Sequence, residues 1–191
     1  MIAMPRMRQR RDDRLIADIV GFWKQAGDRG RWFDKDKGFD RQFHERFLDL
    51  HMAVAGRRHD TWIETPGGAL SPLIRTDQFP RNAFRGTGHM YATDPLARHY
   101  AREAQVTGHM ERVEPSLRLF FCLPFAHSED AVDQEFSVDL NAKLGEPWLS
   151  HAEGHRAIIR RFGRFPHRNP MLGRETTPEE AAFLRAGGFR G

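Results

Sequence analysis

The chain has few of the features that mark several common classes of protein. Its 191 residues include one cysteine, Cys122, so a framework of disulfides within the chain is excluded. No apolar run approaches the roughly 18 residues that a membrane-spanning helix requires. The basic N-terminus also lacks the apolar segment of a signal peptide. We therefore expect a cytoplasmic protein with no membrane partner.

Motifs of common catalytic sites are missing as well. The sequence has no Gly-rich phosphate loop, no Gly-x-Ser-x-Gly nucleophile turn and no paired-cysteine metal signature. His151 and His155 have the spacing of two metal ligands on a helix, but Ala152 stands where a zinc protease has its catalytic glutamate. We therefore expect no metal and no cofactor. Whether the protein is an enzyme stays open.

Positive charge is concentrated at the N-terminus. The formal net charge is +4, and the first fourteen residues contribute +3 of it. They contain two aspartates and five arginines: Arg6, Arg8, Arg10, Arg11 and Arg14. The other 177 residues carry about +1, so the body of the protein is not basic. We do not expect a nucleic-acid partner, because phosphate binding along a strand needs clustered cations. Residues 1–13 are predicted to form a flexible arm, and residues 14–191 a single all-helical domain.

The spacing of apolar residues predicts helices along most of this domain. The clearest case is residues 39–56, where Phe39, Phe43, Phe47, Leu50 and Val54 recur at steps of three or four. Similar patterns predict helices within residues 14–27, 61–79, 93–108, 114–125, 129–145 and 148–163, and from residue 177 onward. Alternating strand patterns are absent. We predict an all-α fold of seven to eight helices packed as antiparallel pairs.

Local chemistry locates several helix ends and one buried side chain. Thr177, followed by Pro178 and then by Glu180 at the third position, forms a complete capping box. Ser128 is expected to cap the helix that follows it. The segment 114–125 is nearly continuous in apolar residues, so it is predicted to be central, with Cys122 packed as a small apolar side chain.

One phrase occurs twice in the chain. DQFPRNAFRGT (77–87) and FGRFPHRNPMLGRETT (162–177) both contain Phe-Pro, then Arg-Asn, then a Gly near an Arg and a Thr. Proline lacks an amide proton and clashes with the preceding helical turn, so we predict that a helix ends at Phe-Pro in each copy. The Arg-Asn pairs would then lie on two corners.

Two interpretations of these corners stay open. In the first they are structural, and the arginines bond exposed carbonyls or pair with nearby carboxylates. In the second they face one cleft, where arginine forks bind the carboxylate or phosphate of a ligand. The candidate ligand-binding residues are polar or charged side chains of the two phrases and of HSED: Asp77, Arg81, Asn82, Arg85, His127, Glu129, Asp130, Arg164, His167, Arg168 and Asn169.

The segment HSED adds a histidine and two carboxylates to this set. His127 beside Glu129 and Asp130 can form an acid–base pair or supply metal ligands. Alternatively, the two acids favour the positive end of the next helix and have no ligand. In either case they offer countercharge to the corner arginines.

Three motifs carry a resemblance to a known family. DQFPRNAFRGT, LPFAHSEDAVDQE and RFGRFPHRNPMLGRETTPEEAAFL, in this order, resemble a bacterial family of uncharacterised proteins, the domain of unknown function family 924. The resemblance spans about Leu15 to Leu184. It implies a helical, TPR-like arrangement and no established reaction. The segment 24–31 is shorter than the loop that relatives place there.

Two functions of different class follow from these observations. One is a polar pocket that binds or converts a small anionic metabolite, with Arg81, His127 and Arg168 near its centre. The other is a TPR-like scaffold that presents a concave face to a protein or peptide partner. Polar residues gathered at turns favour the pocket.

Overall fold

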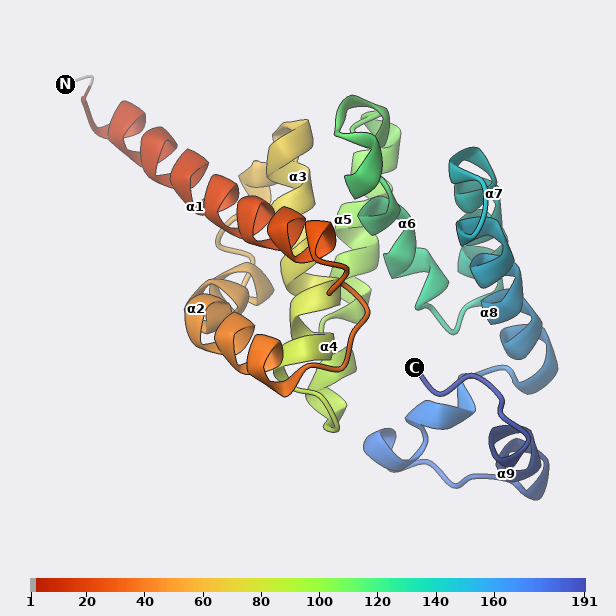
Figure 1. The fold of residues 1–191 in the computed structure, drawn as a ribbon. Coiled ribbons are helices and arrows are strands. Elements are labelled where there is room, and N and C mark those ends of the chain that lie inside the picture. The colour runs from red at the N-terminus through yellow and green to blue at the C-terminus, as the bar shows by residue number, and fades with distance from the viewer. Residues whose placement is uncertain (1–2) are drawn as a thin grey trace. The chain divides into compact units, whose positions relative to one another are not determined.

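The computed structural model describes residues 3–191, with side chains from residue 7 onward, and this range contains helices and no strand (Figure 1). The all-α prediction is therefore confirmed. The chain forms two compact units. Unit 1 comprises Met1–Arg85 and His89–Pro124, and unit 2 comprises Gly86–Gly88 and Phe125–Gly191. The single domain 14–191 and the TPR-like arrangement stay predictions.

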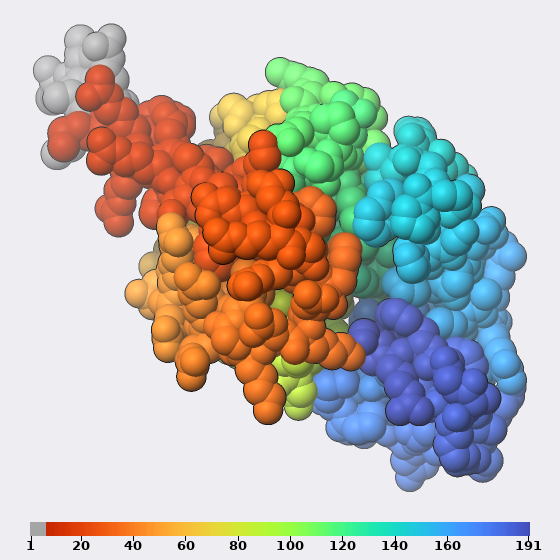
Figure 2. All heavy atoms as spheres, in the orientation of Figure 1, coloured from red at the N-terminus to blue at the C-terminus, as the bar shows by residue number. Residues whose placement is uncertain are grey.

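Unit 1 is built from long helices joined by short helical turns. Its elements are α1 (Ala3–Asp28), α2 (Lys37–Ala55), η1 (Asp60–Glu64), α3 (Pro66–Leu73), η2 (Ile74–Gln78), α4 (Phe79–Ala83), η3 (Gly88–Tyr91), α5 (Asp94–Val106), η4 (Met110–Arg112), η5 (Pro115–Leu117) and α6 (Leu119–Ala126). The first residue of η3 and the last two of α6 are assigned to unit 2. Helix α1 begins upstream of Arg14, because the preceding residues include good helix formers such as Met, Arg and Gln. Figure 2 shows its N-terminal turns, in red, standing out from the surface of unit 1. The flexibility of residues 1–13 stays a prediction.

Aromatic side chains at helical spacing form the core of unit 1. Phe22 of α1 stacks on Phe39 and Phe43 of α2, with ring centroids 5.4 and 5.2 Å apart. Trp23 is fully buried and meets Phe120 of α6 edge-on at 5.4 Å. The predicted apolar stripes therefore do face one another, and their burial is the main apolar stabilisation of this unit.

Unit 2 contains α7 (Ala131–Leu144), α8 (Trp148–Phe162), η6 (Pro166–Arg168), η7 (Pro170–Leu172) and α9 (Pro178–Arg185), with α7 packed along α8. The capping box of Thr177 and Glu180 is confirmed at α9. The cap of α7 is Asp130 and not Ser128: its carboxylate accepts from Val132 N at 2.8 Å and from Asp133 N at 3.2 Å. A carboxylate here also favours the helix dipole.

None of the helices within residues 3–191 is both long and apolar enough to cross a membrane.

Cys122 should resist thiol reagents in the native protein. Its side chain has no exposed surface, and its Sγ lies 3.6 Å from Met110 Sδ, as the burial prediction requires. A thiolate forms poorly in such apolar surroundings. We expect labelling by a disulfide reagent to follow the unfolding curve in urea. Rapid stoichiometric labelling in buffer alone would contradict this burial.

Candidate functional site

The first copy of the repeated phrase continues a helix, so the prediction that a helix ends at Phe79-Pro80 is wrong. Helix α3 widens into the π turn η2, and Phe79 N donates to Ile74 O, five residues back. Pro80 cannot donate to Thr76 O, but Thr93 Oγ1 donates to that carbonyl at 2.6 Å. The chain therefore passes the proline without leaving a buried carbonyl unsatisfied.

The second copy also departs from the prediction. Helix α8 ends at Phe162, where Gly163 adopts the left-handed conformation with φ 68°, and Pro166 then opens the turn η6. A proline at the first position of a helical turn loses nothing, because that amide has no partner within the turn. In both copies Phe-Pro thus begins a short helical turn.

Arg81 lies in a closed ionic network in unit 1. Its two terminal nitrogens donate to the carboxylate of Asp94 at 2.8 and 3.0 Å, and Nη1 is 3.1 Å from Asp77 Oδ1. Burial acts to lower the pKa of Arg81, but the charges of Asp77 and Asp94 outweigh it and raise that pKa above its ordinary value. The buried charge of Arg81 therefore has carboxylate partners, which a buried arginine needs.

The remaining unit 1 candidates extend the same network. Asn82 Nδ2 donates to Gln78 O at 3.0 Å, and Arg85 donates to Asn82 Oδ1 at 3.0 Å. Arg85 also forms a bidentate pair with Asp40, at 2.8 and 3.1 Å. These contacts hold η2, α4 and α2 together.

Unit 2 gathers the candidates of the second phrase around two glutamates. Glu129 accepts two bonds from Arg174, at 2.7 and 3.0 Å, and one from Phe165 N at 2.8 Å. Glu180 accepts from Arg164 at 2.6 and 2.9 Å and from Asn169 Nδ2 at 3.1 Å. The bonds from Arg164 are the main reason that the pKa of Glu180 falls to about 2.

The other candidates lie beside these glutamates. Arg168 Nη2 donates to His127 O at 2.8 Å, and its guanidinium lies 4.7 Å from the Phe165 ring centre. His167 contacts the Phe189 ring edge-on at 5.1 Å. Each unit thus brings together its own candidates. A cleft shared by Arg81 and Arg168 joins residues of both units and stays a prediction.

Replacing Arg81 with Leu should destabilise the protein by about 3 kcal/mol or more, because the change leaves buried Asp77 and Asp94 without their cation. Urea unfolding monitored by circular dichroism measures this difference. The control is Lys24→Met, which removes an exposed pair with Glu114 and should leave the midpoint within error. Equal midpoints for the Arg81 variant and the native protein would refute the structural role of this corner.

His155 is a histidine that folding keeps neutral. Its ring packs against Phe165 at 5.4 Å and Phe189 at 4.6 Å, whereas His151, one turn earlier, is exposed. Burial, followed by the charges of His127 and Arg168, lowers the pKa of His155 to about 3. Among the side chains that the structure describes, no group of three His, Cys, Asp or Glu is placed to hold a metal ion.

The unfolding free energy should therefore fall as the pH falls below about 6. The pKa of His155 is depressed from 6.5 to about 3, so between these values the unfolded chain binds a proton that the folded chain does not. This linkage costs about 1.4 kcal/mol per pH unit. His155→Gln should flatten the acid limb of a stability–pH curve, and His151→Gln on the same helix should not. Identical curves for the native protein and His155→Gln would contradict this assignment.

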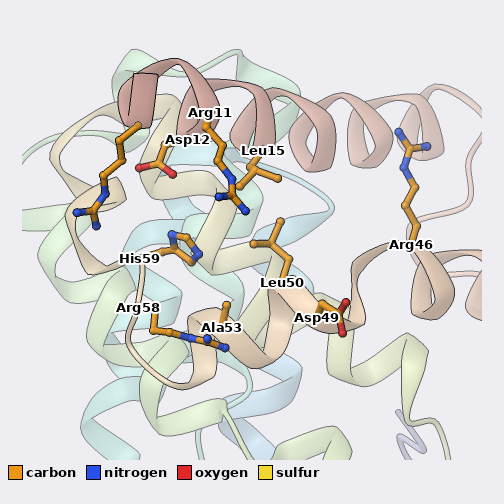
Figure 3. Close-up of a pocket in the computed structure, with 10 residues that line it drawn as sticks. Arg11, Asp12, Leu15, Arg46, Asp49, Leu50, Ala53, Arg58 and His59 are labelled. Carbon is orange, nitrogen blue, oxygen red and sulfur yellow. The ribbon is translucent and has the colours of Figure 1, made fainter. Parts of the chain in front are cut away.

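A groove that the sequence analysis did not single out lies in unit 1 between α1, α2 and the turn after α2 (Figure 3). We call it the arginine groove. Its volume is about 670 Å³. It is lined by Arg8, Arg11, Asp12, Leu15, Arg46, Asp49, Leu50, Ala53, Arg58 and His59. Figure 3 shows Arg11 extending from α1 toward His59, while Leu15 and Leu50 face each other.

The groove residues of α1 and of α2 each follow the helical period, so each set lies on one face of its helix. Arg8, Arg11, Asp12 and Leu15 stand at intervals of three and four and share one face of α1. The same intervals relate the four α2 residues: Arg46, Asp49, Leu50 and Ala53. The sequence therefore contained a pattern that could have indicated this site: two helices with charged and apolar residues at the same spacing.

The turn that carries Arg58 and His59 is locked in place. Arg57 has a left-handed backbone conformation, with φ 60°, which is strained for a residue other than glycine. Its side chain is held by Asp60, at 2.6 Å, and Asp60 also accepts a 2.6 Å bond from Tyr100 OH. An exposed ion pair and a part-buried hydrogen bond thus maintain the strain.

Several groove cations have no anionic partner. Arg46 pairs with Asp18. The side chains of Arg8, Arg11 and Arg58 form no hydrogen bond or ion pair with any residue that the structure describes, although Asp12 and Asp49 also line the groove.

Arg75 lies directly behind the groove and has no exposed surface. Its Nη2 donates to the carbonyl of Leu15, a groove residue, at 3.0 Å, and its Nη1 donates to Ser71 Oγ. The guanidinium lies 5.1 Å from the Trp62 ring, which packs on His59. Its Nε has no hydrogen-bond partner, and the guanidinium forms no ion pair with a described carboxylate, although the charge of Asp18 acts on it. Burial lowers the pKa of Arg75 to about 9.

Comparison with known proteins gives a family and a solved structure. Residues 19–188 match the family described as "Bacterial protein of unknown function (DUF924)". The solved structure, of a protein of unknown function, ATU0120 from Agrobacterium tumefaciens, is 56% identical, and the match covers 92% of this chain and 99% of that one, with a TM-score of 0.89. No curated protein matches the chain. The resemblance predicted from the three motifs is thus confirmed.

Proposed function

The chain belongs to the DUF924 family of bacterial proteins of unknown function, and on that premise we propose that it binds a small anionic ligand in the arginine groove. The observation that carries this proposal is Arg75, a fully buried guanidinium that forms no ion pair with a described carboxylate and feels only the charge of Asp18, which is itself paired with Arg46. Burying a cation without a paired countercharge costs free energy, so such an arrangement persists where something else compensates that cost. Arg75 adjoins the groove through Leu15, a groove residue whose carbonyl accepts a bond from its guanidinium.

The arginines of the two corners differ from those of the groove, because the corner arginines already have carboxylate partners. Arg81, Arg85, Arg164 and Arg174 each already have a carboxylate partner within their own unit. An anionic ligand there would have to displace one of those carboxylates. At the groove, Arg8, Arg11 and Arg58 are available without any such exchange.

The composition of the groove supports a small ligand. Leu15, Leu50 and Ala53 provide apolar surface between the charged residues. Asp12 and Asp49 stand among the arginines, and they would repel the regularly spaced phosphates of a nucleic-acid strand. A compact anion avoids the two carboxylates.

Binding should be detected as an anion-dependent rise in melting temperature that the groove arginines control. Inorganic phosphate and citrate should each stabilise the native protein in a saturable way, because they bind the folded state alone. Arg11→Ala and Arg58→Ala should each weaken the affinity about tenfold, the effect of losing a hydrogen bond to a charged group.

Arg14→Ala is the matched control. Arg14 lies one turn along α1 from Arg11, is exposed and does not line the groove, and its loss changes the net charge equally. If Arg14→Ala and Arg11→Ala reduced the affinity to the same degree, the effect would be general screening and the proposed site would be wrong.

A further inference from the structure

We infer that the ligand of the arginine groove is a phosphate monoester with a small apolar organic group, an inference that rests on the proposed function. It is drawn from the charge of the groove, from its apolar floor and from the arrangement of its donors.

The charge around the groove matches a dianion. Four arginines and two aspartates line it, and Arg46 is already paired with Asp18, so the lining retains one uncompensated positive charge. Arg75 behind the groove adds a second. With His59 neutral, the resulting charge is +2. It balances the charge of −2 that a phosphate monoester carries above its second pKa.

The apolar floor of the groove favours a ligand that has an apolar organic group. Leu15 and Leu50 face each other across it, and Ala53 lies beside them (Figure 3). A volume of about 670 Å³ falls within the range of sites for organic ligands of moderate size and is far larger than an inorganic oxyanion needs. Inorganic phosphate would leave this apolar surface exposed to water, whereas an apolar substituent would cover it.

The donors that line the groove come from two separate elements. Arg8 and Arg11 belong to α1, and Arg58 and His59 belong to the turn after α2. Guanidinium forks pair well with phosphate, which offers three terminal oxygens where a carboxylate offers two. Donors on two separate elements can therefore bind different oxygens of one phosphate.

Isothermal titration calorimetry at pH 8 tests this inference with four probes. Phenyl phosphate is a dianion with an apolar ring, phenyl sulfate has the same shape and a single charge, and inorganic phosphate and succinate are dianions without the ring. We expect phenyl phosphate to bind at least tenfold more tightly than each of the others. Equal affinity for phenyl sulfate, inorganic phosphate or succinate would overturn the inference.

Variants separate this inference from the proposed function. Leu50→Asn makes the floor polar, so it should reduce the affinity for phenyl phosphate toward that of inorganic phosphate and leave the latter unchanged. Arg58→Ala, at an exposed position, should weaken both anions. If no probe binds, the proposed function itself fails. If all four bind equally and Arg58→Ala weakens all of them, the anion site stands and the ligand class is wrong.

Discussion

The pairing of buried carboxylates with guanidinium groups is the constraint on which the local architecture of both units depends. In unit 1 the carboxylates of Asp77 and Asp94 surround Arg81, and in unit 2 Glu180 receives Arg164. Such pairs contribute modest net stability, because desolvation opposes the attraction, but the loss of one partner is costly. They therefore fix which helical turns lie together. Arg75 stands apart, since its buried charge is met by neutral acceptors and an aromatic ring.

The π turn η2 links the corner of unit 1 to the arginine groove. Arg75 and Asp77 both belong to this five-residue turn, yet Arg75 reaches α1 and Asp77 reaches Arg81. Residues two apart on a helix point to nearly opposite sides, so a single turn serves both places. The widened backbone is kept by Thr93, which replaces the donor that Pro80 lacks. Turns of this kind are frequent at functional sites.

The sequence predicted well those features that depend on local pattern. The steps of Phe39, Phe43 and Phe47 predicted a buried helical face, and the chemistry of Thr177 and Glu180 predicted the start of α9. It failed where the outcome depends on which side chain reaches a backbone group in the folded chain. The rule that proline ends a helix neglects Thr93, and the cap of α7 depends on which of two neighbouring side chains reaches the helix amides. The groove was missed because its residues come from three separate segments and the burial of Arg75 is visible only after folding.

The central claim is that an anion in the groove completes the charge balance of Arg75. The side-chain Nε–H resonance of Arg75, observed by nitrogen–proton NMR and assigned with Arg75→Lys, tests this most directly. We predict that phenyl phosphate shifts this resonance in a saturable way, at the same concentrations that saturate calorimetric binding. A resonance that stays in place while those of exposed arginines move would contradict the account.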